Sequence, residues 1–142
     1  RTLGPGSYSD STSYLWTFGD GQLEGNIEYR LKLFKRINGA FFIDAGNIWL
    51  RQPDEKRPGG EFKLDRFYKE IAIGSGLGIR IDFSFVILRF DIGLKIRDPQ
   101  FAENERWVIQ KLFDPSWKKE YQEVYNKQYN YLAFNFGIGY PF

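Results

Sequence analysis

The stretch FFIDAGNIW, residues 41 to 49, raises the question that decides the fold of this chain. Its aromatic and β-branched residues are typical of a buried strand, yet Asp44 lies in the middle and Gly46 follows it. A carboxylate that is buried in an apolar core without a partner costs several kcal/mol or becomes neutral. Asp44 therefore predicts that this strand has a wet side, or that its carboxylate is paired.

The same alternation of apolar with charged or small residues recurs along the chain. A period of two residues is typical of a strand with one apolar and one polar face. The first such segment also has a helical spacing, but Gly25 and the unbroken alternation favour a strand. The sequence predicts an all-β protein with strands at about residues 22–34, 39–50, 69–83, 85–97 and 131–142.

These predicted strands are longer than the five or six residues usual in soluble proteins, and they match the nine to eleven tilted residues that span a bilayer. Their polar faces carry Arg, Lys, Asp and Glu, which suits a hydrated lumen. Short connections near residues 35–38 and 83–85 alternate with long ones at 51–68 and 98–130, as in bacterial barrels. The pattern predicts an antiparallel transmembrane β-barrel. Because five strands do not close such a barrel and Arg1 is not Met, we expect a piece of a longer protein.

The composition excludes several classes of chemistry. The chain has no Cys and no His, so disulfides, thiolate chemistry and the commonest metal ligand are absent from it. A net charge of +2 does not indicate nucleic-acid binding. Gly74, Gly76 and Gly78 lack the spacing and the following helix of a nucleotide loop, and predict a smooth lumenal stripe or strong sheet curvature. We expect no catalytic residue, no metal and no cofactor.

Four pieces of the chain, in this order, carry a family resemblance: GDGQLEGNIEYRLKLF, FFIDAGNIW, GSGLGIRIDF and the terminal FNFGIGYPF. They resemble the outer-membrane assembly and translocation factors of the BamA and TamA type, in the bacterial surface antigen family. RTLGPGSY and the long insertion before the last strand are similar to versions from Bacteroidota. The resemblance implies a barrel of about sixteen strands. Residues 22–142 would be its last five strands, and residues 1–21 the remnant of an extracellular loop that folds into the lumen.

The resemblance also implies roles for two motifs. In the family, an arginine of the lumenal loop meets the aspartate of a D-x-G strand motif, which Asp44 and Gly46 match. A bidentate bond between a guanidinium and a carboxylate would fix the loop, and we expect the arginine upstream of Arg1. An Asp that begins a turn is the alternative, which the apolar residues continuing to Leu50 disfavour. The second motif is a barrel assembly signal in the terminal strand, formed by Leu132, Phe134, Phe136, Ile138, Tyr140 and Phe142.

From this resemblance we expect a non-catalytic protein of the Gram-negative outer membrane that inserts or translocates other proteins. The expected partners are outer-membrane lipid, client proteins and subunits of an assembly complex, without nucleic acid. An opening seam between the first and last strands would expose an edge to incoming strands. Two alternatives stay open. The barrel could anchor a patatin-like phospholipase, or the chain could be a small soluble lipid-binding β-barrel.

Three further expectations concern particular faces and loops. Phe41, Ile43 and Trp49 share the apolar parity and are expected to face lipid. Residues 98–130 show short helical spacings that Pro115 interrupts, so this segment is either a partner-binding or pore-capping element or a solvated loop. Charged residues of the polar parity predict salt bridges across the lumen: Glu24, Glu28, Arg30, Lys32, Arg80, Asp82, Arg89, Asp91, Lys95 and Arg97.

Overall fold

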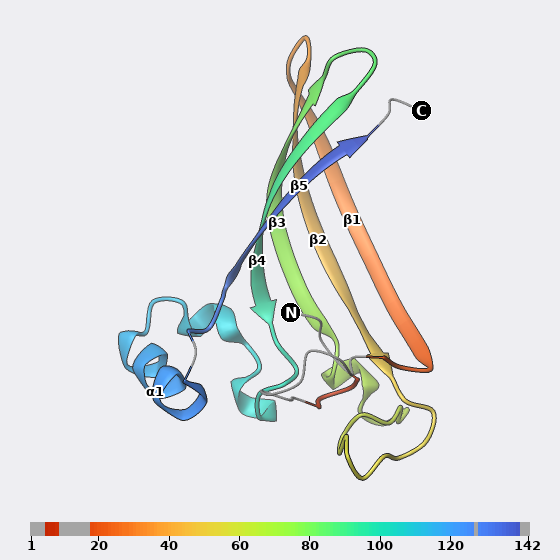
Figure 1. Cartoon of the computed structure of the whole chain (residues 1–142), viewed down its shortest axis with the longest axis vertical. Coiled ribbons are helices and arrows are strands. Elements are labelled where there is room, and N and C mark those ends of the chain that lie inside the picture. The colour runs from red at the N-terminus through yellow and green to blue at the C-terminus, as the bar shows by residue number, and fades with distance from the viewer. Residues whose placement is uncertain (1–4, 9–17, 127, 140–142) are drawn as a thin grey trace.

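The computed structural model describes residues 5–8, 18–126 and 128–139 of the chain. Its five strands form one antiparallel sheet in the order β1-β2-β3-β4-β5 (Figure 1). The predicted all-β fold with five antiparallel strands is therefore confirmed. The strands are β1 (Gly21–Phe34), β2 (Ile37–Trp49), β3 (Ala72–Asp82), β4 (Ile87–Arg97) and β5 (Leu132–Gly139).

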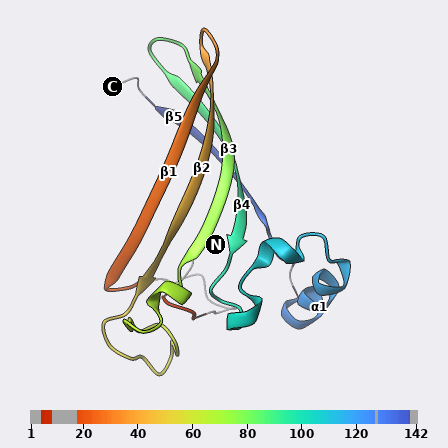
Figure 2. The same cartoon turned by 180° about the vertical axis from the view of Figure 1, so that it is seen from behind.

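The short and the long connections lie at opposite ends of the sheet. The turns at residues 35–36 and 83–86 are at one end, and β5 ends on that side (Figures 1 and 2). In the second turn Ser84 has a φ of 70°, and its N–H donates to the Asp82 carboxylate at 2.8 Å. The long connections 50–71 and 98–131 lie at the other end. We refer to these as the turn end and the loop end of the sheet.

The helices of the described residues all lie in the two long connections: η1 (Phe67–Lys69), η2 (Glu103–Glu105), η3 (Val108–Lys111) and α1 (Pro115–Tyr125). None of them is long and apolar enough to cross a membrane. Pro115, which the sequence pattern presents as an interruption, is the first residue of α1. The Asp114 carboxylate caps the helix by accepting the N–H groups of Ser116 and Trp117.

Strand pairing sorts the side chains into an apolar and a polar face. One row of the apolar face crosses all five strands, since each member pairs with the next. These side chains are between 42% and 72% exposed. Among the residues that the structure describes, nothing covers them, so this face offers a wide apolar surface to its surroundings. The row consists of Tyr29, Phe41, Leu77, Ile92 and Phe134.

Trp49 departs from the expectation that it faces lipid, and that prediction is wrong. The side chain is only 2% exposed, although it shares the parity of the apolar face. Its ring packs edge-on against Phe62 and Phe67, with centroids 5.6 and 6.4 Å away. Its indole N–H donates to the Glu70 carboxylate at 2.7 Å. The connection 50–71 folds back over this end of β2, which strand alternation alone does not reveal.

The second long connection is a folded insert with its own core. Val108 is completely buried, and Asp98 is 1% exposed. The Asp98 carboxylate accepts the Tyr129 hydroxyl at 2.7 Å and the backbone N–H of Gln100 at 3.1 Å. Aromatic rings pack against one another around α1 with centroids 4.8 to 6.1 Å apart. They belong to Phe101, Trp117, Tyr121, Tyr129 and Tyr131.

Candidate functional site

A chain of ion pairs crosses the polar face near the turn end. Glu28 of β1 pairs with Arg30 at 2.6 Å and with Arg80 of β3 at 2.9 Å. Arg80 also contacts Asp91 of β4 at 3.3 Å, and Asp91 contacts Arg89 at 3.2 Å. Arg80 and Asp91 are 5% and 9% exposed, so the centre of this network is buried. The predicted salt bridges across the polar face are confirmed for these five residues.

Two of the three glycines of β3 make room for side chains of the same face. A Cβ added at Gly78 would collide with the carboxylate of Asp91 and with the guanidinium of Arg80. A Cβ at Gly76 would collide with the ring of Phe42. Gly74 differs, because the nearest atom to its added Cβ is a carbonyl oxygen 3.6 Å away. Each glycine of the expected stripe therefore meets different neighbours, and only the surface at Gly74 is open.

Asp44 lies in β2 on the polar face, towards the loop end. Strand pairing places it between Asn26 of β1 and Gly74 of β3. Its side chain is exposed, and no residue in the described part of the chain hydrogen-bonds to it or pairs with it. Two residues later, a Cβ added at Gly46 would lie 2.7 Å from the backbone oxygen of Leu23. Gly46 thus permits the close approach of β1, and Asp44 is left accessible from the polar side.

A hollow of about 320 Å³ surrounds Asp44. It is lined by parts of β1, β2, β3 and β4, including Glu24, Gly74 and Lys95. Lys95 lies 5.2 Å above the ring of Tyr129, in the insert. The lining carries acidic side chains on Glu24, Asp44 and Asp98 and basic ones on Lys95 and Arg97, so one further cationic group would balance its charge.

Arg97 is predicted to join the charges of the polar face, and it lines the hollow beside Asp44, but its guanidinium bonds to backbone groups of the connection 50–71. The β3–β4 register shifts between Ile73 and Gly74, and Arg97 pairs with Ile73 beyond that shift. Its guanidinium donates to the backbone oxygens of Lys69 and Ile71. Arg97 therefore ties the end of β4 to the connection 50–71. The alternation contains no signal for this shift.

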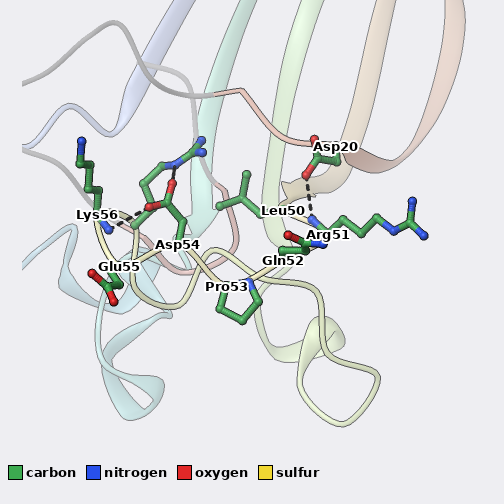
Figure 3. A pocket seen from close by; sticks show the side chains of 9 residues that line it. Asp20, Leu50, Arg51, Gln52, Pro53, Asp54, Glu55 and Lys56 are labelled. Atoms are coloured by element: carbon green, nitrogen blue, oxygen red, sulfur yellow. Dashed lines mark hydrogen bonds and ion pairs between the residues drawn. The ribbon is translucent and has the colours of Figure 1, made fainter.

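A second hollow, of about 720 Å³, lies in the connection after β2 (Figure 3). Two of its three acidic side chains, those of Asp20 and Asp54, accept hydrogen bonds from neighbouring groups. Asp20 accepts the N–H of Arg51 at 2.9 Å, and Asp54 accepts those of Lys56 and Arg57 at 2.9 and 2.8 Å. Hydrogen bonds from Arg57 and from the Lys56 backbone hold the pKa of Asp54 below its usual range. These contacts shape the loop.

The described residues hold no group of three or more Asp or Glu side chains placed to bind a metal ion. Their most buried carboxylates are satisfied by protein groups. Glu70 is 2% exposed, and it pairs with Arg66 at 2.9 Å besides accepting the indole N–H of Trp49. The polar face of the sheet thus offers charged groups for ion pairing, and its opposite face offers an apolar surface.

The terminal strand β5 places its alternating apolar residues on the apolar face. Leu132, Phe134, Phe136 and Ile138 are all exposed, and the ring of Phe136 lies 5.0 Å from that of Phe90 in β4. The last two members of the expected assembly signal, Tyr140 and Phe142, lie outside the described residues, as does Arg1. Within the described part, β5 pairs only with β4 and β1 only with β2. Both outer strands thus present an open edge.

Comparison with protein families gives a match to the Omp85 superfamily domain over residues 1–142. Neither the comparison with curated proteins nor that with solved structures gives a match.

Proposed function

The chain belongs to the Omp85 superfamily, and from this premise we propose that it forms the last five strands of an outer-membrane barrel of the BamA/TamA type. The superfamily is one of bacterial outer-membrane proteins that insert or translocate other proteins. The proposed role is non-catalytic. Membrane lipid, client proteins and subunits of an assembly complex are its proposed partners.

The contrast between the two faces of the sheet is the observation that carries this proposal. The exposed apolar row from Tyr29 to Phe134 suits contact with lipid, while the ion pairs around Arg80 suit a hydrated lumen. A soluble protein rarely exposes so wide an apolar surface. The open edges of β1 and β5 can pair with further strands, as closure of a larger barrel requires.

The two ends of the sheet support an orientation in the membrane. Bacterial barrels have short turns on the periplasmic side and longer loops outside. We therefore assign the turn end to the periplasm, and the connection 50–71 and the folded insert to the cell surface. Residues 1–21 would belong to a loop that starts outside and enters the lumen.

We assign Asp44 as the anchor of that lumenal loop. Its carboxylate is exposed on the polar face, and the hollow around it is lined by Glu24 and by the open surface at Gly74. An arginine from upstream of Arg1 would fit this surplus of negative charge. Its planar guanidinium can bind a carboxylate through two parallel hydrogen bonds, which fixes direction as well as distance.

The open edge of β5 is the proposed site of client contact. An unpaired strand edge presents N–H and C=O groups to which an incoming strand can add. The alternating residues from Leu132 to Phe142 would form the assembly signal of the barrel itself. Insertion in this mechanism needs exchange of strand pairing and no covalent step.

Reconstitution of the full-length protein tests the proposal. Liposomes containing it should fold a urea-unfolded β-barrel client faster than liposomes with an unrelated outer-membrane barrel at the same density. Equal rates, together with unchanged outer-membrane protein levels after depletion in cells, would contradict the proposal. Release of fatty acids from the same liposomes would instead indicate the phospholipase-linked alternative.

A further inference from the structure

Asn47 makes contacts that neither the sequence pattern nor the proposed function assigns. Its side chain is 6% exposed, at the loop end of β2. The amide nitrogen donates to the backbone oxygen of Gly6 at 2.7 Å and to that of Glu70 at 2.6 Å. The amide oxygen accepts the N–H of Ile48 at 2.8 Å. One buried amide thus joins the N-terminal segment, β2 and the end of the connection 50–71.

Residues 5–8 fit closely into the place where Asn47 holds them. The N–H of Gly6 donates to the Ile48 oxygen at 2.7 Å, and that of Ser7 to the Gly59 oxygen at 3.1 Å. Pro5 is among the fully buried side chains. Gly6 has a φ of +55°, and an added Cβ there would collide with the Gly59 carbonyl. Gly59 has a φ of +80°, so the close fit requires glycine at both positions 6 and 59.

The geometry of β2 explains why this place exists. Pairing between β2 and β3 stops at Gly46 and Ala72, although β2 continues to Trp49. The backbone oxygen of Ile48 would lack a strand partner on that side, and Gly6 supplies the missing N–H. The N-terminal segment therefore takes the position that a longer β3 would occupy.

We infer that Asn47 is a positioning residue that fixes residues 5–8 to the end of β2. The N-terminal segment then has an attachment point of its own, three residues along the strand from Asp44. This inference stands on contacts between described residues and does not depend on the proposed function. Asparagine suits the role because it offers two donors and one acceptor without a charge.

A thiol reporter at Ser7 tests the inference in the full-length protein in its membrane. These 142 residues contain no Cys, and Ser7 is partly buried, so Ser7→Cys should react slowly with a maleimide. Asn47→Asp removes both donors and turns a carboxylate towards two carbonyl oxygens. Labelling of Cys at position 7 should then rise at least about tenfold, the effect of one or two lost buried hydrogen bonds.

Two controls separate positioning from general loosening. Asn104→Asp makes the same change at an exposed residue of the insert and should leave labelling unchanged. A second reporter, Ser116→Cys on α1, should label equally with and without Asn47→Asp. Unchanged labelling at position 7, or an equal rise at position 116, would overturn the inference.

Gly6→Ala approaches the same contact from the other segment and leaves β2 intact. It should raise labelling at position 7 by a similar factor. Combined with Asn47→Asp it should add little, because both changes break one attachment. Fully additive effects would also overturn the inference. Heat-dependent gel mobility shows whether Asn47→Asp prevents assembly. In that case the labelling of position 7 in the Gly6→Ala variant alone tests the inference.

Discussion

The Asp44 carboxylate makes no hydrogen bond or ion pair with any described residue, although Lys95 and Arg97 line the same hollow. The acidic residues Glu24 and Asp98 and several glycines also line this hollow, and β2 continues on both sides of Asp44 without a turn. A carboxylate in such a position is stable while it is exposed to water. In a barrel whose lumen holds a loop, it would need a partner to offset the loss of water.

Asp44→Asn therefore tests the anchor at the scale of one residue. If an upstream arginine binds Asp44 in the full-length protein, the neutral variant leaves a guanidinium unpaired and should destabilise the barrel by about 3–5 kcal/mol. The measurement is the temperature at which the compact form is lost on a gel. Glu24→Gln, a neutral change in the same hollow, should have a smaller effect. Equal melting of Asp44→Asn and the unchanged protein would refute the anchor.

The glycines of β3 allow a second comparison between single residues. Gly78→Ala forces a methyl group into the Arg80–Asp91 ion pair and should cost about 1–3 kcal/mol of stability. Gly74→Ala adds the same methyl group where the nearest atom is 3.6 Å away, so the cost should be small. Urea unfolding of the two variants in detergent measures the difference. Equal losses would show that strand conformation, and not the ion pair, requires glycine.

The alternation along the strands predicts the surroundings of some side chains and not of others. Alternation predicts the faces of Asp44 and Phe41, because parity follows from strand geometry alone. It does not predict the burial of Trp49, which depends on a loop that returns from later in the chain. Nor does it predict Arg97, because a register shift in β4 changes which groups its side chain meets.

At the scale of elements, the insert was the least predictable part. Its helix α1 begins at a proline, and the sequence carried the signal for it, an Asp followed by Pro. The aromatic rings around α1 come from residues spread over positions 101 to 131, and no local sequence pattern predicts which of them pack together. Every strand follows the same two-residue alternation, whereas a small irregular core depends on how particular side chains pack together.

Two links of unequal strength join this insert to the connection 50–71. Arg106 donates to the backbone oxygens of Lys69 at 2.6 Å and of Phe101 at 3.1 Å. Lys69 and Glu103 form an exposed ion pair at 2.6 Å. Arg106→Gln should therefore speed hydrogen exchange around η1 and η2, while Lys69→Gln should change it little, because exposed pairs contribute little. The opposite order would show that charge, and not the guanidinium bonds, links the two connections.

The pKa shifts of the same pair set the pH range over which its contribution to stability is constant. Lys69 lowers the pKa of Glu103, so this contribution is present above the usual Glu value and is lost as pH falls through the lowered pKa. Glu103 raises the pKa of Lys69, so the contribution is lost only as pH rises through that raised value. Hydrogen-exchange rates at η1, corrected for the intrinsic pH dependence of amide exchange, should be constant between about pH 5.5 and 9. A step within that range would indicate another titrating group.

For the whole molecule, the direction of the apolar face distinguishes a membrane barrel from a soluble one. A small soluble barrel turns its apolar residues inward to hold a ligand. The row through Leu77 lies on the opposite face from the ion pairs of Arg80 and Asp91. In the membrane arrangement, Leu77 meets lipid near the middle of β3, whereas Leu64 in the connection 50–71 meets water.

Leu77→Arg and Leu64→Arg make one chemical change at two similarly accessible sites, 66% and 78% exposed. Arginine on the lipid face near the membrane centre costs about 2–4 kcal/mol, so Leu77→Arg should reduce the folded fraction in liposomes. Leu64→Arg should behave like the unchanged protein, because its side chain stays in water. Urea titration in liposomes measures both. If the two variants are equally stable, the apolar face does not contact lipid, and the assignment of this sheet to a membrane barrel is wrong.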